Sequence, residues 1–502
     1  MRNTVVGVCV ILLTLSGYVY GKTTATLNGG GGGKRLGSSN IRSFASSPRQ
    51  DEPSVTVESS RPSDTSKKLR FEGKREKTID RVVYTYRGYL LDRVGGVWID
   101  SVKRPFVLAI DKVEFDSTVE NITIPDQIDG IPVVEIGVKS FQNCSRVKRV
   151  VLPKKILKIH NEAFDGCRAL EILNGLDSCR EIGCCAFRNC NKLRTRIVFK
   201  NDVNIWFSAF EGCYEIESVE FQGRINPNWD MVCDKLPDKV FLDCRNLSHF
   251  VFPVGVKDIG ESAFSNCRSL KNVIIPDSVE TMWHDSFRGC TSLASVTIAS
   301  NVKSIQSGVF AECSSLKNVT MDESNTFSIN DRAFRDCPKL ESVEFKCTRN
   351  NAIKATIGKE VFKNCSKLKR FDLKGTYIID DAKGLFLNCT SLTKVSFSLK
   401  TLSKIPESMF ENCSSLSSVK LGKAKIISSC AFKECSSLVN IDLKNVQTIE
   451  KGAFLNCCNL QEIIFGKKLN QIDPKAFHSC NKINKVYIQG KGMGREIIEA
   501  IP

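Results

Sequence analysis

Cysteine is the residue type in this sequence whose number and spacing could do chemistry. The chain has 23 cysteines in 502 residues, and fifteen of them, from Cys144 to Cys480, come three residues after a phenylalanine. In a secreted chain so many cysteines would ordinarily indicate a disulfide framework. One cysteine at a fixed apolar offset in each repeat instead behaves as a small buried hydrophobic side chain. We therefore predict a ladder of buried, mostly reduced thiols.

A second group of cysteines departs from this spacing. Cys179, Cys184, Cys185 and Cys190 lie within twelve residues of each other. A zinc site would need tighter and more typical pair spacing. The sequence favours a local disulfide between two non-repeat cysteines over a metal site, so we predict no metal ion and no cofactor.

Other catalytic residues are sparse. Histidine, the most frequent general acid or base in enzymes, occurs four times, at positions 160, 249, 284 and 478. The chain has no nucleophile elbow, no His-Glu-x-x-His zinc motif, no phosphate-binding loop and no dinucleotide fingerprint. We therefore expect a protein that is not an enzyme and has no catalytic residues.

The cysteines are positioned by a repeat that is clearest from Ile259 to Pro276, which reads IGESAFSNCRSLKNVIIP. Its phenylalanine recurs fifteen times, most often every 23 residues. The alternation of Val273 and Ile275 with polar residues predicts a short strand, and the spacing of Phe264 and Cys267 suits one tight 3₁₀ or helical turn. A unit this short cannot bury its own apolar edge, so its copies must stack, with each strand pairing in parallel with the next. The predicted structural ladder includes Phe264, Cys267, Phe287, Cys290, Phe310 and Cys313.

The pattern Leu-x-x-Val-x-Ile-Pro, followed by Val-x-x-Ile-Gly-x-x-Ala-Phe-x-x-Cys, resembles the BspA-type leucine-rich repeat. The resemblance implies an α/β repeat solenoid, a horseshoe or superhelix of about fifteen ~23-residue coils. A parallel sheet would line its concave side, with short helical or 3₁₀ turns on the other side. One unit has Asp381 where the others have Ile, Leu or Met, which predicts a distorted coil around residues 377–386.

The rest of the chain divides into segments by composition. Residues 1–21 read as a secretory signal peptide, with an apolar run too short to span a membrane. Residues 22–79 are rich in Ser, Gly and basic residues and predict a disordered tether. Residues 80–134 predict an N-terminal β cap with a first partial repeat, 135–488 the repeats, and 489–502 a tail. We expect no transmembrane span after signal removal.

Two intervals between repeat phenylalanines are long and predict loops. Phe210 to Phe241 spans 31 residues and Phe334 to Phe362 spans 28. Insertions in repeat proteins usually emerge on one face and sometimes carry binding. A tolerated loop without a function is the favoured explanation.

The formal net charge is +17, but the excess is spread along the chain. A nucleic-acid groove needs a clustered basic stripe, so we predict no nucleic-acid partner. The strand residues that point away from the core instead predict a long polar face suited to a protein or a glycan. A merely solvated face is the alternative for each residue. The candidates are Asn272, Ile274, Ser295, Thr297, Asn318, Thr320, Ser342, Glu344, Arg370, Asp372, Lys394, Ser396, Ser418 and Lys420.

Seven asparagines occur in Asn-x-Ser/Thr sequences and are candidate N-glycosylation sites in a secreted chain. Four of them directly precede the repeat cysteine, where other units have mainly Asn, Gly or Asp. Residues of that set tolerate left-handed backbone, so a structural role explains them fully and is favoured over glycosylation. The seven are Asn121, Asn143, Asn246, Asn318, Asn364, Asn388 and Asn412.

The signal peptide and the family resemblance together predict a secreted or cell-surface protein. The resemblance implies adhesion or recognition of proteins on cells or matrix. The alternative is a structural component of a cell coat or matrix that has no discrete ligand.

Overall fold

The computed structural model describes residues 73–91, 93–94, 97–98, 105–224, 234–322, 326–346, 354–372, 376–378, 381–396 and 402–489. The predicted signal peptide, most of the predicted tether and almost all of the tail lie outside these ranges. Parts of the two insertions, residues 225–233 and 347–353, also lie outside them.

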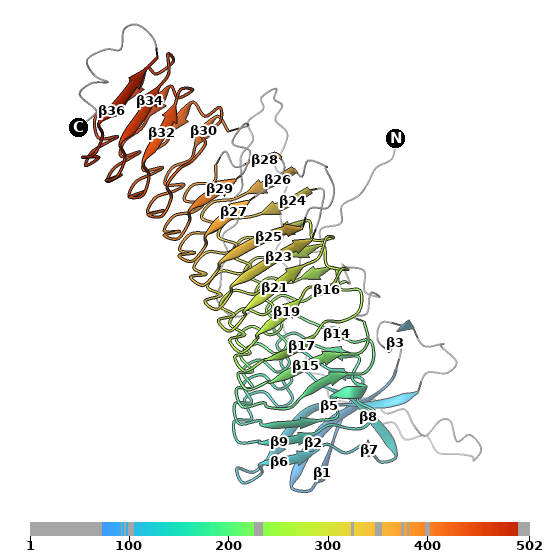
Figure 1. Cartoon of the computed structure of the whole chain (residues 1–502). Helices are drawn as coiled ribbons and strands as arrows, with labels where there is room; N and C mark the ends of the chain where they lie inside the picture. Colours follow the sequence, from blue (N-terminus) through green and yellow to red (C-terminus); the bar gives the residue numbers. More distant parts are fainter. Residues whose placement is uncertain are drawn as a thin grey trace, which may run out of the picture. The chain divides into compact units, whose positions relative to one another are not determined.

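The repeats build a β-solenoid with two series of parallel strands (Figure 1). The first strand series contains the predicted Val-x-Ile strands, and strands of neighbouring coils pair in register, for example Val273 with Val296. Its members are β6 (Asn121–Thr123), β9 (Arg149–Val151), β11 (Ile172–Asn174), β13 (Ile197–Phe199), β15 (Ser218–Phe221), β17 (His249–Val251), β19 (Asn272–Ile274), β21 (Ser295–Ile298), β23 (Asn318–Asp322), β25 (Ser342–Lys346), β27 (Arg370–Asp372), β29 (Lys394–Ser396), β32 (Asn440–Leu443), β34 (Glu462–Phe465) and β36 (Lys485–Ile488).

The second strand series lies five to six residues before each repeat phenylalanine in most coils. The two-residue strands of this series each place one apolar side chain in the core, as Ile259 does in β18. The sequence pattern predicted one sheet, and this series is an addition to it. Its members are β8 (Ile131–Ile136), β10 (Lys158–Ile159), β12 (Glu181–Ile182), β14 (Asn204–Ile205), β16 (Lys235–Leu236), β18 (Asp258–Ile259), β20 (Thr281–Met282), β22 (Ser304–Ile305), β24 (Thr326–Ile329), β26 (Lys354–Ile357), β28 (Thr376–Ile378), β30 (Lys404–Ile405), β31 (Ile426–Ile427), β33 (Thr448–Ile449) and β35 (Gln471–Ile472).

The Phe-x-x-Cys segments are β-turns, which corrects the prediction of short helical or 3₁₀ turns. The residues two before and two after the phenylalanine have left-handed backbone in nearly every coil, as Ser262 (φ 53°) and Asn266 (φ 61°) do around Phe264. A helix needs an unbroken run of right-handed residues, so these two positions prevent one. The Cys267 N–H closes the turn on Phe264 O at 3.1 Å, while the Phe264 N–H bonds to Ser286 O of the next coil at 2.8 Å. Within the described residues the one short 3₁₀ helix, η2 (Leu176–Ser178), lies outside these turns.

The core is a stack of identical side chains from successive coils. Phe264 and Phe287 stack with ring centroids 5.0 Å apart and an interplanar angle of 9°. Cys267 donates its thiol hydrogen to the backbone carbonyl of Phe241 in the preceding coil at 3.3 Å. The six ladder residues named above are all 0% exposed, and the twenty cysteines within the described residues are free thiols.

Antiparallel strands extend the second strand series at its N-terminal end. β1 (Lys74–Ile79) pairs with β2 (Val82–Leu90), β2 pairs with β5 (Phe106–Phe115), and β5 runs parallel to β8. Two shorter antiparallel pairs are β3 (Arg93–Val94) with β4 (Val97–Trp98) and β7 (Gln127–Ile128) with β8. Because β1 lies within 22–79, regular structure begins before the predicted boundary at residue 80.

The distortion predicted around Asp381 is present in the strand register. Thr356 of β26 lies six residues before its repeat phenylalanine, but it pairs with Ile378 of β28, which lies eight residues before Phe386. Asp381 itself is exposed. Exposure is expected, because burying an unpaired carboxylate in an apolar core costs free energy. The second strand series continues in a separate sheet that begins at β30.

Candidate binding surfaces

The outward side chains of the first strand series form the surface that the sequence predicted for binding. Successive strand residues point to opposite sides, so Val273 is buried while its neighbours Asn272 and Ile274 are exposed. Ile274 is 78% exposed and is the most exposed large apolar side chain among the described residues. Among the candidates whose side chains the structure describes, Thr320 and Ser342 are half-buried and the others are exposed.

Strand pairing brings eight of these residues together in two rows. One row aligns Asn272, Ser295, Asn318 and Ser342, and the other aligns Ile274, Thr297, Thr320 and Glu344. Within the first row the Ser342 hydroxyl donates to Asn318 Oδ1 at 3.0 Å. The two rows run across β19, β21, β23 and β25 and give one continuous polar surface.

The remaining candidates lie apart from these rows. Arg370 pairs with Lys394, and Asp372 with Ser396, in the separate two-stranded sheet of β27 and β29. Ser418 and Lys420 are exposed but belong to a coil whose equivalent segment is not a strand. The predicted face is thus divided into three stretches.

Three of the candidate glycosylation sites are tied together by their side chains. The Asn388 amide donates to Asn364 Oδ1 at 2.7 Å, and the Asn412 amide donates to Asn388 Oδ1 at 3.1 Å. All three residues have left-handed backbone. The Nδ2 atoms that a glycan would modify in Asn388 and Asn412 are the donors of this ladder. Asn121, Asn143, Asn246 and Asn318 are instead exposed.

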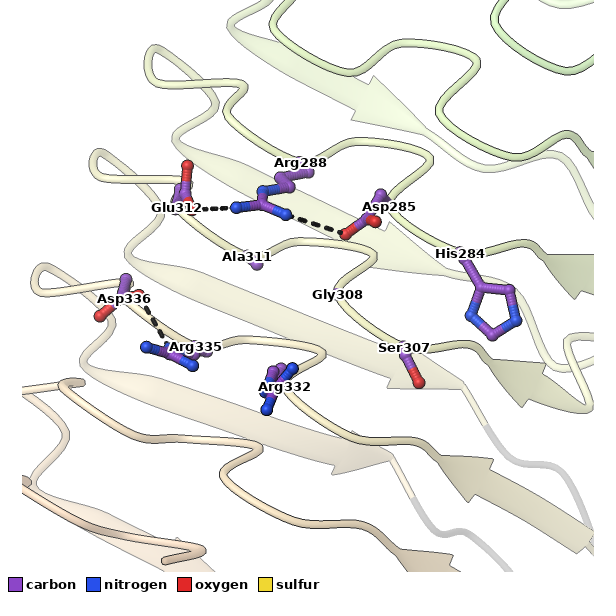
Figure 2. A pocket seen from close by; sticks show the side chains of 10 residues that line it. All are labelled: His284, Asp285, Arg288, Ser307, Gly308, Ala311, Glu312, Arg332, Arg335 and Asp336. Carbon is purple, nitrogen blue, oxygen red and sulfur yellow. Dashed lines mark hydrogen bonds and ion pairs between the residues drawn. The ribbon is translucent and has the colours of Figure 1, made fainter. Parts of the chain in front are cut away.

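A cavity of about 320 Å³ lies on the Phe-x-x-Cys side of the solenoid, across the coils of Phe287, Phe310 and Phe334. We call it the turn-side notch. Figure 2 shows Ala311 on its floor between Arg288 and Arg335, which come from the preceding and the following coil. These three residues share one position, directly after the repeat phenylalanine. A small residue between two long ones at that position therefore leaves a gap one coil wide.

Gly308 has no side chain that could fill the bottom of the notch. Its φ is +69°, and a Cβ at this position would lie 2.2 Å from Asp285 Oδ1. A side chain here would collide with the Asp285 carboxylate as well as strain the backbone. Neither the notch nor its arginines were predicted from the sequence. The available signal was the pair of small residues, Gly308 and Ala311, between coils that carry arginine.

Ion pairs hold the arginines of the notch. Arg288 Nη2 donates to Glu312 Oε1 at 2.6 Å, and this bond raises the pKa of the Arg288 guanidinium. Arg332 and Arg335 both donate to Glu360 Oε2, at 3.1 and 3.0 Å. Burial alone would raise the pKa of Glu360, but hydrogen bonds from Lys363 and Arg332 outweigh it and lower the pKa.

The four clustered cysteines are separate, protonated thiols. Cys179, Cys184, Cys185 and Cys190 are free thiols, which corrects the local disulfide favoured by the sequence. Cys179 instead donates to the backbone carbonyl of Glu181 at 3.2 Å. Burial raises the pKa of Cys179 to about 12 and those of Cys184 and Cys185 to about 11, so these thiols stay protonated at neutral pH. Among the described residues, no three His, Cys, Asp or Glu side chains are grouped closely enough to hold a metal ion.

The repeats match the model of a known protein family. The family model for the "BspA type Leucine rich repeat region (6 copies)" matches residues 109–227, 234–369 and 355–484. The chain belongs to the BspA-type leucine-rich repeat family. Proteins of this family are leucine-rich repeat proteins that generally bind other proteins and are typically non-catalytic.

Solved structures resemble the BspA-type array of this chain. A leucine-rich repeat protein from Bacteroides ovatus is 24% identical, covers 82% of this chain and 94% of its own, and has a TM-score of 0.56. A leucine rich cell surface protein from Faecalibacterium prausnitzii is 21% identical, covers 86% and 98%, and has a TM-score of 0.41. The similarity to the Bacteroides ovatus protein shows the fold. No curated protein sequence matches the chain.

The part of the BspA-type chain that the structure describes contains no helix with the length and apolar character needed to cross a membrane.

Proposed function

We propose that this chain is a secreted or cell-surface protein that binds a protein or glycan partner through the outward face of the first strand series. The observation that carries the proposal is the strand register, which aligns Asn272, Ser295, Asn318 and Ser342 in one polar row, with the first three exposed and Ser342 half-buried. Membership of a family that generally binds proteins supports it. The signal-type sequence of residues 1–21 supports a location outside the cell.

A partner on this face would contact several coils at once. Neighbouring strands are ~4.8 Å apart, so a ligand of ordinary protein size spans many of them. None of the fourteen candidate residues is aromatic, so the face lacks the large aromatic anchors that concentrate binding energy. We therefore expect the binding energy to be spread, so that one alanine substitution changes affinity little.

Charge reversal at three coils tests this proposal. Arg370, Lys394 and Lys420 are exposed, so replacing all three with Glu should leave the fold intact. Binding to the cognate cell or matrix surface should fall by about tenfold or more, because like charges across an interface cost several kcal/mol. Surface plasmon resonance of the secreted, purified chain on immobilised cell or matrix extract measures this.

The control is the same number of reversals away from this face, at the exposed residues Lys423, Lys451 and Lys468. It should bind like the unmodified chain. Equal binding by both triple variants, with the contact mapped to the segment before residue 80 or to 221–238, would contradict the proposal. Concentration-dependent self-association without ligand binding would favour the alternative of a structural coat component.

A further inference from the structure

We propose that a cluster of lysines near the C-terminal end of the solenoid binds an acidic glycan. The cluster lies where the chain passes from the first strand series to the second, just before β31, β33 and β35. We call it the lysine corner. It includes no residue of the first strand series, so it is separate from the surface proposed above. Its members are Lys423, Lys425, Lys444, Lys467 and Lys468, all of them exposed.

The strand register brings these lysines together. Ile426 of β31 pairs with Thr448 of β33, which pairs with Gln471 of β35, so residues equally far before these three lie side by side. The side-chain amide of Asn445 donates to Gly422 O at 2.9 Å, which confirms that neighbouring corners are in contact. The five lysines therefore span two strand steps, roughly 9.6 Å at ~4.8 Å per step. The positions one, three and four residues before the paired residues hold Lys425, Gln447 and Asn470, then Lys423, Asn445 and Lys468, then Gly422, Lys444 and Lys467.

The lysine corner differs from the same corner of earlier coils because most of its charges are unpaired. In an earlier coil Lys200, which is equivalent to Lys444 and Lys467, lies 2.9 Å from Asp177 of the coil before it. At the lysine corner Lys444 lies 3.4 Å from Asp442. The other four lysines form no ion pair and no side-chain hydrogen bond with any residue that the structure describes.

The sequence of the lysine corner shows why its lysines are unpaired. Residues 422–425, 444–447 and 467–470, which form the three corners, contain no Asp or Glu. Charge excess of one sign on a surface raises the local concentration of ligands with the opposite charge. Because four exposed ammonium groups lie together without a carboxylate among them, the lysine corner favours an anionic ligand with several charges.

The other residues of the lysine corner favour a glycan over other polyanions. Asn445, Gln447 and Asn470 carry side-chain amides, which can both donate hydrogen bonds to hydroxyls and accept them. An acidic glycan presents sulfate or carboxylate groups together with hydroxyls, which matches lysines interspersed with amides. The apolar residues Ala424 and Leu469 are buried, so the corner lacks an apolar face that enters lipid. It also has no aromatic side chain on which the bases of a nucleic acid stack.

The test uses the full chain and fluorescein-labelled dextran sulfate, with unsulfated dextran of the same length as its uncharged match. Fluorescence anisotropy at low salt should show binding of dextran sulfate and at least about tenfold weaker binding of dextran, because the attraction depends on charge. Raising the ionic strength from about 0.01 M to about 0.1 M should weaken the binding, since the Debye length falls from about 30 Å to about 10 Å. Polyglutamate, a polyanion without hydroxyls, should bind at least about threefold more weakly than dextran sulfate.

A variant with Lys423→Gln, Lys425→Gln, Lys467→Gln and Lys468→Gln should raise Kd for dextran sulfate by at least about tenfold. The matched control removes four exposed lysines that lie apart from one another, through Lys155→Gln, Lys192→Gln, Lys271→Gln and Lys317→Gln. Net charge falls equally in both variants, so the control should change Kd by less than about threefold. Circular dichroism checks folding. If the first variant is not folded, Lys467→Gln with Lys468→Gln decides the matter and should raise Kd by at least about threefold.

Equal affinity for dextran sulfate and dextran, or an equal loss in the corner variant and its control, would overturn the proposal. Tighter binding of polyglutamate than of dextran sulfate would assign the lysine corner to an acidic protein segment instead of a glycan. Lys423 and Lys468 also belong to the control variant for the first strand series. That measurement therefore uses extract treated with glycosaminoglycan lyases, so that glycan binding at the lysine corner does not contribute and either proposal can fail without the other.

Discussion

The repeat cysteine makes the same contact in coil after coil. Cys267, Cys290 and Cys313 each donate a thiol hydrogen to the carbonyl of the phenylalanine in the preceding coil, at 3.3 Å. Burial raises the pKa of Cys290 to about 12, so the thiol keeps the hydrogen that this contact needs. This side chain is small enough for the core and still donates a second hydrogen bond to a buried carbonyl, which valine or alanine cannot do.

At the residue scale, Cys290→Ala should lower the free energy of unfolding by about 1–2 kcal/mol, through a small cavity and the loss of one of the two hydrogen bonds to Phe264 O. Urea denaturation followed by circular dichroism measures the change. Cys458→Ala is the control, because Cys458 is exposed and its loss should cost less than about 0.5 kcal/mol. Equal stability of Cys290→Ala and the unmodified chain would contradict a structural role for the thiol ladder.

At the scale of elements, the sequence predicted what its periodicity could show. The Val-x-Ile alternation predicted the first strand series, with coils aligned as found for Val273 and Val296. The second strand series was missed because strands of two residues, such as Asp258–Ile259, are too short to show a period of two. The Phe–Cys spacing indicated a helical turn, but it could not reveal the left-handed residues on either side. The turn-side notch was missed because it depends on which coils are neighbours.

Substitutions in the hydrogen-bonded row of Asn364, Asn388 and Asn412 test the role of those left-handed residues. Asn388→Ala should lower the free energy of unfolding by about 2 kcal/mol, because alanine disfavours left-handed backbone and loses both ladder bonds. Asn388→Gly keeps the backbone conformation accessible and should cost less than the alanine variant. Urea denaturation of the two variants separates the contributions. If glycine is as destabilising as alanine, the backbone conformation at this position is not what selects asparagine.

At the scale of the whole solenoid, stability comes from each coil covering the next, so the first coil needs a cover of another kind. β2 and β5 provide apolar side chains for this, with Tyr84 1% exposed and Leu108 and Ile110 fully buried. Asp111 on β5 lies 3.4 Å from both Lys74 and Arg87, which joins β1 and β2 to the same sheet. We infer that these antiparallel strands protect the edge of β8 from pairing with another chain.

Deleting residues 73–118 tests this cap. The deletion would expose the backbone edge of β8 and the side chains of Val133 and Ile136, which are fully buried in the intact chain. An uncovered strand edge beside exposed core residues recruits other chains, so the shortened protein should form oligomers or precipitate. Size-exclusion chromatography with light scattering should show this at micromolar concentration. Deleting residues 22–72, the part of the predicted tether that precedes β1, should leave both the oligomeric state in solution and the melting temperature unchanged. A monomeric, fully soluble product of the first deletion would mean that the repeat array closes its own N-terminal end.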